Sequence, residues 1–194
     1  MNASREAERL SSYAALLRKW NPAINLVSPS TLADLEARHI ADSRQLAGMV
    51  QNTPDTWLDL GSGGGLPGMV LAICHPALTV TLLDADSRKV AFLRTVIRQL
   101  QLENCRAVAA RIEQHAPAHA ANVSARALAP LDRLMPYLVR HLAEDGTAWL
   151  MKGRNWQQET DVARRHWRFD VIAHPSTTDP GAAILQISRI ARHG

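Results

Sequence analysis

Residues 59–68 of this chain read DLGSGGGLPG and follow the short apolar segment 56–60. That segment predicts a buried strand, and the apolar run 69–73 after the glycines predicts a helix. Glycines allow positive φ and let backbone N–H groups come close to a ligand. The first turn of the following helix directs its unpaired N–H groups at the same point. The order of strand, glycine turn and helix therefore predicts the nucleotide-binding corner of a doubly wound sheet.

Two kinds of nucleotide ligand fit the spacing of the glycines. The dinucleotide fingerprint G-x-G-x-x-G fits at Gly63, Gly65 and Gly68, which keeps an NAD(P) oxidoreductase open. The series Asp59-x-Gly61-x-Gly63-x-Gly65 resembles motif I of the class I methyltransferases that use S-adenosyl-L-methionine (AdoMet). A glycine-rich turn that binds nothing is the third possibility.

The chain from residue 53 onward alternates between strand and helix patterns. Strands are expected at 56–60, 79–84, 105–110, 122–127, 146–152, 168–174 and 183–190, and helices at 66–74, 87–101, 131–142 and 155–166. This alternation predicts an α/β fold, a Rossmann-like core over 53–194 with a mostly parallel seven-stranded sheet and helices on both faces. Ser87 is expected to cap the helix over 87–101.

Residues 1–52 are expected to form an N-terminal helical cap on the same domain, so that 1–194 is a single unit. Apolar residues at 10, 13, 14 and 17 predict a helix over 5–20. We expect it to end at Trp20-Asn21-Pro22, because proline disfavours the helical conformation in the residue before it. The pair Thr31-x-x-Asp34 resembles a capping box and predicts a second helix that runs to about residue 50.

The composition and charge of the chain indicate which binding partners and which cellular compartment to expect. A net charge of +4, carried mostly by arginine, favours RNA or DNA, because the guanidinium suits phosphates and base edges. The helix over 87–101 has basic residues at 88, 89, 94 and 98, a face that either binds RNA or is only solvated. Cysteines and histidines show no metal spacing, so no metal is expected. Neither a signal peptide nor a membrane-spanning run is found, and we expect a cytoplasmic protein that does not bind membranes.

Several polar residues end predicted strands, at the edge where doubly wound sheets bind ligands. Asp84 is expected to accept hydrogen bonds from ribose hydroxyls. The segment Arg111-Ile112-Glu113 is either part of a site or a surface charge pair. Arg126 interrupts a small, apolar strand end, where a charge is costly unless it is paired or bound, so it predicts either a site residue or a structural salt bridge. His39 is either catalytic or a packing residue.

Two motifs that are missing from the sequence limit the kinds of methyl transfer to consider. No Asn/Asp-Pro-Pro-aromatic run follows the fourth strand, so methylation of exocyclic amines through that motif is unsupported. No Pro-Cys pair supplies a nucleophile for C5-pyrimidine chemistry. Methyl transfer to an atom with a free lone pair, such as guanine N7, remains. It needs positioning and electrostatics but no general base.

A series of sequence boxes closely resembles the bacterial GidB family (glucose-inhibited division protein B), also called the small-subunit rRNA methyltransferase G. The boxes are Trp20-Asn21-x-x-x-Asn25-Leu26, Arg38-His39-Ile40-x-Asp42-Ser43, Asp59-x-Gly61-x-Gly63-x-Gly65-Leu66-Pro67-Gly68, Leu82-Leu83-Asp84, Lys89-x-x-Phe92-Leu93, Ser124-x-Arg126-Ala127 and Lys152-Gly153. They occur in this order and span residues 13 to about 190.

The resemblance implies a class I AdoMet methyltransferase fold and N7-methylation of one guanosine in 16S rRNA, in the small ribosomal subunit or an assembly intermediate. We expect it to act as a monomer. It further implies that Arg126 and Asn25 are catalytic, Arg126 bordering both cofactor and guanine. The other AdoMet-binding residues implied are Gly61 and Leu66 at the methionine part, Gly63 in the loop, Asp84 at the ribose, and Ile112 and Glu113 at the adenine.

Two rival functions remain at this stage. A Rossmann oxidoreductase on NAD(P) would need a set of hydride-site residues that the sequence does not show. A non-catalytic RNA-binding protein would not need an intact AdoMet loop. Binding of AdoMet or its product, compared with NADH, separates the three functions.

Overall fold

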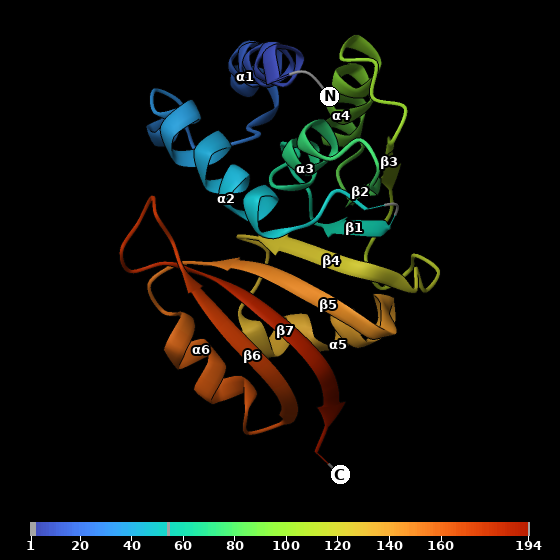
Figure 1. Cartoon of the computed structure of the whole chain (residues 1–194), viewed down its shortest axis with the longest axis vertical. Helices are drawn as coiled ribbons and strands as arrows, with labels where there is room; N and C mark the ends of the chain where they lie inside the picture. Colours follow the sequence, from blue (N-terminus) through green and yellow to red (C-terminus); the bar gives the residue numbers. More distant parts are fainter. Residues whose placement is uncertain (1–2, 54, 194) are drawn as a thin grey trace.

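A seven-stranded sheet runs through the molecule in the order β3-β2-β1-β4-β5-β7-β6 (Figure 1). The computed structural model describes residues 3–53 and 55–193. Every strand is parallel to its neighbours except β7, which is antiparallel to β5 and β6. The strands are β1 (Thr56–Leu60), β2 (Thr79–Asp84), β3 (Cys105–Ala109), β4 (Ala120–Arg126), β5 (Leu142–Lys152), β6 (Trp167–Pro175) and β7 (Ala183–Arg192).

Helices cover both faces of the sheet, as the alternating pattern predicts (Figure 1). The N-terminal cap, α3 (Gly68–Cys74) and α4 (Ser87–Gln99) share one hydrophobic cluster with one face of the sheet. Helices α5 (Leu131–His141) and α6 (Trp156–Ala163) contribute to the cluster on the other face. Each predicted strand and helix of the core is present, with shifts at the ends of a few residues. The Rossmann-like fold class is therefore confirmed.

The cap differs from its prediction in two places. Helix α1 (Ala3–Ile24) does not end at Asn21 but continues through Pro22. The carbonyl of Asn21 accepts a bond from Asn25 N, and its side-chain Oδ1 accepts bonds from the N–H groups of Leu26 and Val27, both at 2.8 Å. These bonds stabilise the last turn of α1 in spite of Pro22. The prediction considered only the effect of proline on the residue before it, and so it missed this stabilisation.

The second predicted cap helix is broken into three pieces. A 3₁₀ turn (Pro29–Thr31) and a π-helical turn (Leu35–Ile40) precede α2 (Ala41–Met49). The capping-box prediction is wrong, because the Thr31 hydroxyl donates to Ser28 O inside the first turn. The prediction for Ser87 is also wrong: Asp86 caps α4 by accepting a bond from Arg88 N at 2.8 Å. A carboxylate one residue earlier reaches the free N–H group better.

The cap packs directly onto the glycine turn, here called the glycine loop (residues 61–68). The hydroxyl of Tyr13 donates to Gly64 O at 2.7 Å, in the interior. A Cβ on Gly64 would lie 3.2 Å from Leu17 and 3.3 Å from Leu26. The cap therefore covers the loop. That residues 1–194 form a single domain stays a prediction. No helix in the described residues is long and apolar enough to cross a membrane.

We predict that Tyr13→Phe lowers the free energy of unfolding by about 1–3 kcal/mol, since Gly64 O would be left buried without its partner. Urea unfolding measures the change. Tyr137→Phe is the control, because it removes a hydroxyl that only makes a surface contact with Glu113. Equal effects in the two variants would show that the bond to Gly64 O is not what ties the cap to the loop.

Candidate functional site

The glycine loop bends sharply where β1 ends. Gly61, Gly63 and Gly65 have φ of 60°, 55° and 97°, in the region that favours glycine. Two backbone bonds close the turn, Ser62 N to Leu83 O at 3.0 Å and Gly65 N to Ser62 O at 2.6 Å. The loop is thus a defined backbone structure that a chain without these glycines could adopt only under strain.

Asp84 ties the loop to the neighbouring strand. Its Oδ2 accepts a bond from Gly63 N at 2.7 Å, and its Oδ1 accepts one from Asp86 N at 2.8 Å. A carboxylate has about four acceptor sites, so these two bonds leave capacity for ribose hydroxyls. The structure therefore adds a role in shaping the loop to the predicted contact with ribose.

Asp59 lies beneath the loop with no exposed surface. The Trp57 indole N–H donates to Ser124 Oγ at 2.8 Å, and Ser124 Oγ donates to Asp59 Oδ1 at 2.6 Å. Burial raises the pKa of Asp59 to about 6, against the opposing effect of hydrogen bonds from Ser124 and Ser62. The sequence indicates Asp59 through its place before the glycines. The bond from Ser124 to Asp59 has no such signal, because it forms only where β4 pairs with β1.

The segment predicted at the adenine is held by α5. His141 Nε2 donates to Ile112 O at 2.9 Å, and the Tyr137 hydroxyl donates to Glu113 Oε1 at 2.5 Å. The hydroxyl of Tyr137 is also the main cause of a lowered pKa at Glu113. Ile112 is half-buried and Glu113 is exposed at the carboxyl end of β3. Sequence reasoning missed Tyr137 and His141, whose contacts exist only because α5 packs beside this loop.

Two further predicted residues are Asn25, in the cap, and Leu66, in the glycine loop itself. Asn25 is exposed, with φ of 48°, and directly precedes Leu26, which packs on Gly64. Leu66 is 5% exposed and its side chain belongs to the core. A contact from Leu66 to a ligand can therefore come only from its main chain.

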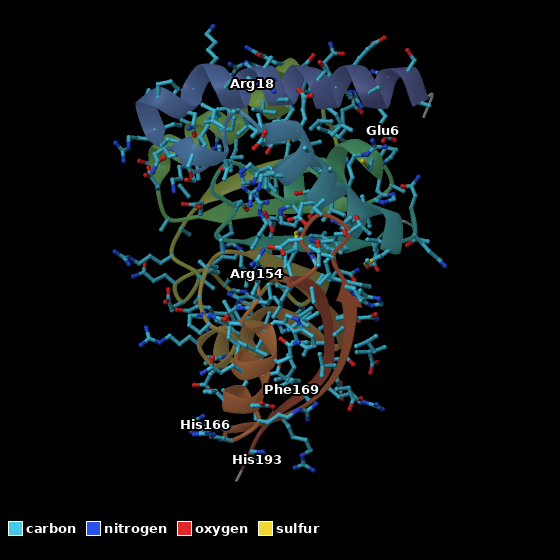
Figure 2. The ribbon with its side chains drawn as sticks, turned by 90° about the vertical axis from the view of Figure 1, so that its left-hand side faces the viewer. Glu6, Arg18, Arg154, His166, Phe169 and His193 are labelled. Carbon is cyan, nitrogen blue, oxygen red and sulfur yellow. The ribbon has the colours of Figure 1, made fainter. Side chains whose placement is uncertain are left out.

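A cleft of about 620 Å³ opens beside the loop, at the carboxyl ends of β4 and β5. Leu128 lines it and also touches the glycine loop, since a Cβ on Gly61 would lie 2.6 Å from Leu128 Cδ1. Figure 2 looks onto this edge, with α1 across the top, Arg154 near the middle and His193 at the far end. The polar lining includes Arg38, His39, Asp42, Arg126, Lys152 and Thr178.

Arg126 and Asp42 lie next to each other in the wall of this cleft. Arg126 Nη1 lies 3.6 Å from Asp42 Oδ2, and the side chains are 17% and 21% exposed. Burial lowers the pKa of Arg126, and the charge of Asp42 opposes that effect. The structure thus shows the ion pair that the salt-bridge alternative predicted. It also places Arg126 in the wall of the cleft, so a structural salt bridge and a role in the site do not exclude each other.

His39 and Lys152 have structural partners. The Thr31 hydroxyl donates to Ser28 O, so its oxygen accepts a bond from the Nε2–H of His39 at 2.7 Å. Burial lowers the pKa of His39 to about 4, with further lowering by Arg126 and Arg38, so the ring is neutral at physiological pH. Lys152 donates to Ala129 O at 2.7 Å and Glu159 at 2.8 Å. Within the described residues, no cluster of side chains could hold a metal ion.

Comparisons by family model and by sequence match this chain to the same kind of protein. The model of the GidB family, described as rRNA small subunit methyltransferase G, matches residues 6–186. A ribosomal RNA small subunit methyltransferase G of Paracoccus denitrificans is 56% identical over the whole of both chains. One from Ruegeria sp. is 45% identical, covering 99% of this chain and 95% of the relative.

Solved structures with much lower sequence identity share the fold. An S-adenosylmethionine-dependent methyltransferase from Aquifex aeolicus has a TM-score of 0.63 at 11% identity, covering 83% of this chain and 98% of its own. A putative S-adenosyl-L-methionine-dependent methyltransferase from Methanococcus maripaludis has a TM-score of 0.61 at 13% identity, covering 93% of each chain. At these identities the likeness bears on the fold alone.

We predict that Asp59 makes the protein less stable as the pH rises from about 4 to about 6. Its pKa in the folded protein is about 6, against an ordinary value of 3.8, so the folded state holds a proton that the unfolded state has lost. Relative to Asp59→Asn, the wild-type protein should lose up to about 3 kcal/mol across this range and nothing further above it.

Urea unfolding at several pH values measures this difference. The exposed Asp161→Asn serves as control, and its difference from the wild type should change little. A constant offset between wild type and Asp59→Asn at every pH would contradict the prediction, because it would reflect lost hydrogen bonds and not a displaced pKa.

Proposed function

As the chain belongs to the GidB family, the rRNA small subunit methyltransferases G, we propose that it transfers a methyl group from AdoMet to N7 of one guanosine in 16S rRNA. The observation that carries this proposal is the glycine loop beside the cleft that holds Arg126. Membership in a methyltransferase family sets aside the NAD(P) oxidoreductase and the non-catalytic RNA-binding protein.

The residues present fit AdoMet. A Cβ on Gly63 would have no heavy atom closer than 3.9 Å, so open space lies against the loop backbone where a cofactor can approach. When bound there, AdoMet supplies a methyl group on a positively charged sulfur. The loop at Gly61 and the main chain of Leu66 hold its methionine part, Asp84 accepts from its ribose, and Ile112 and Glu113 flank its adenine.

Guanine N7 carries a free lone pair, so no proton has to be removed before it attacks a methyl group. The polar residues of the cleft fit a reaction that needs no general base. His39 is neutral and bonded to Thr31, and Glu159 accepts bonds from Lys152 and Leu131 N. Asn25 borders the reacting centre without supplying a base. The chain contributes by holding the two reactants in line, which is the main requirement of such a displacement.

The partner is the 16S rRNA, in the small subunit or an assembly intermediate, and the enzyme acts as a monomer in the cytoplasm. The net charge of +4 and the arginine-rich composition suit an RNA substrate. On α4, Arg88 pairs with Asp86 and Arg94 donates to Ala107 O, while Arg98 is exposed. This helix thus offers RNA fewer unpaired charges than its sequence suggests.

We predict that Gly63→Val abolishes AdoMet binding in a folded protein, because the side chain would fill the cofactor's space and φ of 55° disfavours a β-branched residue. Calorimetry with AdoMet measures binding. Gly48→Val, in α2, is the control, since a Cβ on Gly48 meets no heavy atom within 4 Å. Normal affinity in a folded Gly63→Val variant would remove the loop from the binding site.

We predict that Arg126→Ala slows methyl transfer to 16S rRNA by about 10²-fold or more, the scale of losing a preorganised electrostatic donor. Stability should change little, because Asp42 keeps its bonds from Thr178 and Gln45. Labelled-methyl transfer and thermal unfolding are measured on one preparation, with Arg18→Ala as control for a surface pair with Glu36. A stable variant with normal turnover would show that Arg126 is not functional, and an unfolded one that its role is structural.

A further inference from the structure

Arg126 and Asp42 present a hydrogen-bond donor and an acceptor side by side in the wall of the cleft. Arg126 ends β4, and Asp42 lies in the first turn of α2. Their facing atoms, Nη1 and Oδ2, are 3.6 Å apart. This separation is longer than a good bond between charged groups, so the pair does not use up either partner.

The two oxygens of Asp42 have different surroundings. Oδ1 accepts bonds from the Thr178 hydroxyl at 2.9 Å and from Gln45 Nε2 at 3.2 Å. Gln45 is itself fixed, because its Oε1 accepts a bond from Thr177 N at 2.7 Å. The carboxylate is therefore oriented by α2 and the β6–β7 connection, without needing Arg126. Oδ2 faces only Arg126 in the part of the chain that the structure describes.

Arg126 also keeps capacity for a ligand. A guanidinium has five N–H donors, and within residues 3–53 and 55–193 its only polar side-chain partner is Asp42. A largely buried cation with unused donors is costly unless something else accepts from them. The cleft thus contains an arginine N–H and a carboxylate oxygen, next to each other and both available.

We propose that Asp42 and Arg126 together recognise the target guanine, with Arg126 donating to O6 and Asp42 Oδ2 accepting from N1–H. This inference rests on the proposed function. Guanine has an acceptor, O6, beside a donor, N1–H, which is the complement of the pair. Adenine reverses the order, with an amino donor beside the N1 acceptor, so it would place donor against donor and acceptor against acceptor. Enzymes that act on an extruded base read this edge by such bonds.

The arrangement also orients N7. O6 and N7 lie on the same side of guanine, so a base held through O6 by Arg126 has N7 close by. Arg126 ends β4, which pairs with β1, the strand that leads into the glycine loop. Leu128 touches the loop at Gly61 and lines the cleft. A guanine bound to the pair would therefore turn N7 toward the loop where the methyl donor is held.

The test compares Asp42→Asn with Glu36→Gln, a matched change in an exposed ion pair with Arg18. Methyl transfer is measured on small ribosomal subunits that lack the modification, with calorimetry of the product S-adenosylhomocysteine and thermal unfolding alongside. We expect Asp42→Asn to lose about 10- to 100-fold in kcat/KM, the scale of one specific base contact. Affinity for S-adenosylhomocysteine and the melting temperature should stay near those of the control.

Normal turnover by Asp42→Asn would overturn the inference, and so would a parallel loss of S-adenosylhomocysteine binding, which would mean that Asp42 acts through the cofactor site. Failure of the wild-type enzyme to methylate guanosine N7 would instead reject the proposed function itself.

A second measurement tests which edge of the base is read. Inosine monophosphate keeps O6 and N1–H, whereas adenosine monophosphate reverses them. Inosine monophosphate should inhibit methyl transfer by the wild type at about tenfold lower concentration than adenosine monophosphate, and Asp42→Asn should remove the difference. Equal inhibition of the wild type by the two nucleotides, or none by either, would contradict recognition by the pair, as would a difference that survives in Asp42→Asn.

Discussion

The hydrogen bond from Gly63 N to the Asp84 carboxylate joins the ends of β1 and β2, and the rest of the site depends on it. It ties a loop in which Gly61, Gly63 and Gly65 have positive φ to the end of β2. The other neighbours of the loop complete the constraint. Asp59 lies below it, and Tyr13 of the cap bonds to Gly64 O above it. A cofactor site made of main chain is rigid only when its loop is held from several sides in this way.

The electrostatics of the site suit a reaction in which no proton has to be removed before the methyl group is transferred. A histidine in the cleft is kept neutral by burial and by two arginines, and it is bonded to a threonine. The buried Asp59 has a pKa raised to about 6, but its bonds run to Ser124 inside the sheet and not into the cleft. Arg126 and Asp42 lie together in the wall of the cleft, and such a donor–acceptor pair suits holding a base in place more than acid–base chemistry.

The cleft is assembled from segments that are distant in sequence. Asp42 comes from the N-terminal cap, Arg126 from the end of β4, and Thr178 from the connection between β6 and β7. The direction of β6 makes this possible. Because β6 and β5 are both antiparallel to β7, β6 runs in the same direction as β5, and the β6–β7 connection lies at the carboxyl edge of the sheet. The cap therefore has two tasks, covering the glycine loop and supplying one wall of the cleft.

The sequence alone was enough to predict the fold class, the order of strands and helices in the core and the glycine loop, and to indicate Asp84 and Arg126 as candidates. These features follow from local periodicity and from residues adjacent in the chain. The sequence did not determine the continuation of α1 through Pro22, the broken second cap helix or the cap on α4, because longer-range contacts and competing side chains outweigh local rules there. Nor did it show that Arg126 meets Asp42, or that Tyr137 and His141 hold the segment at Ile112 and Glu113. Those contacts join residues that only the packing of helices on the sheet brings within hydrogen-bond or ion-pair distance, and no local pattern encodes them.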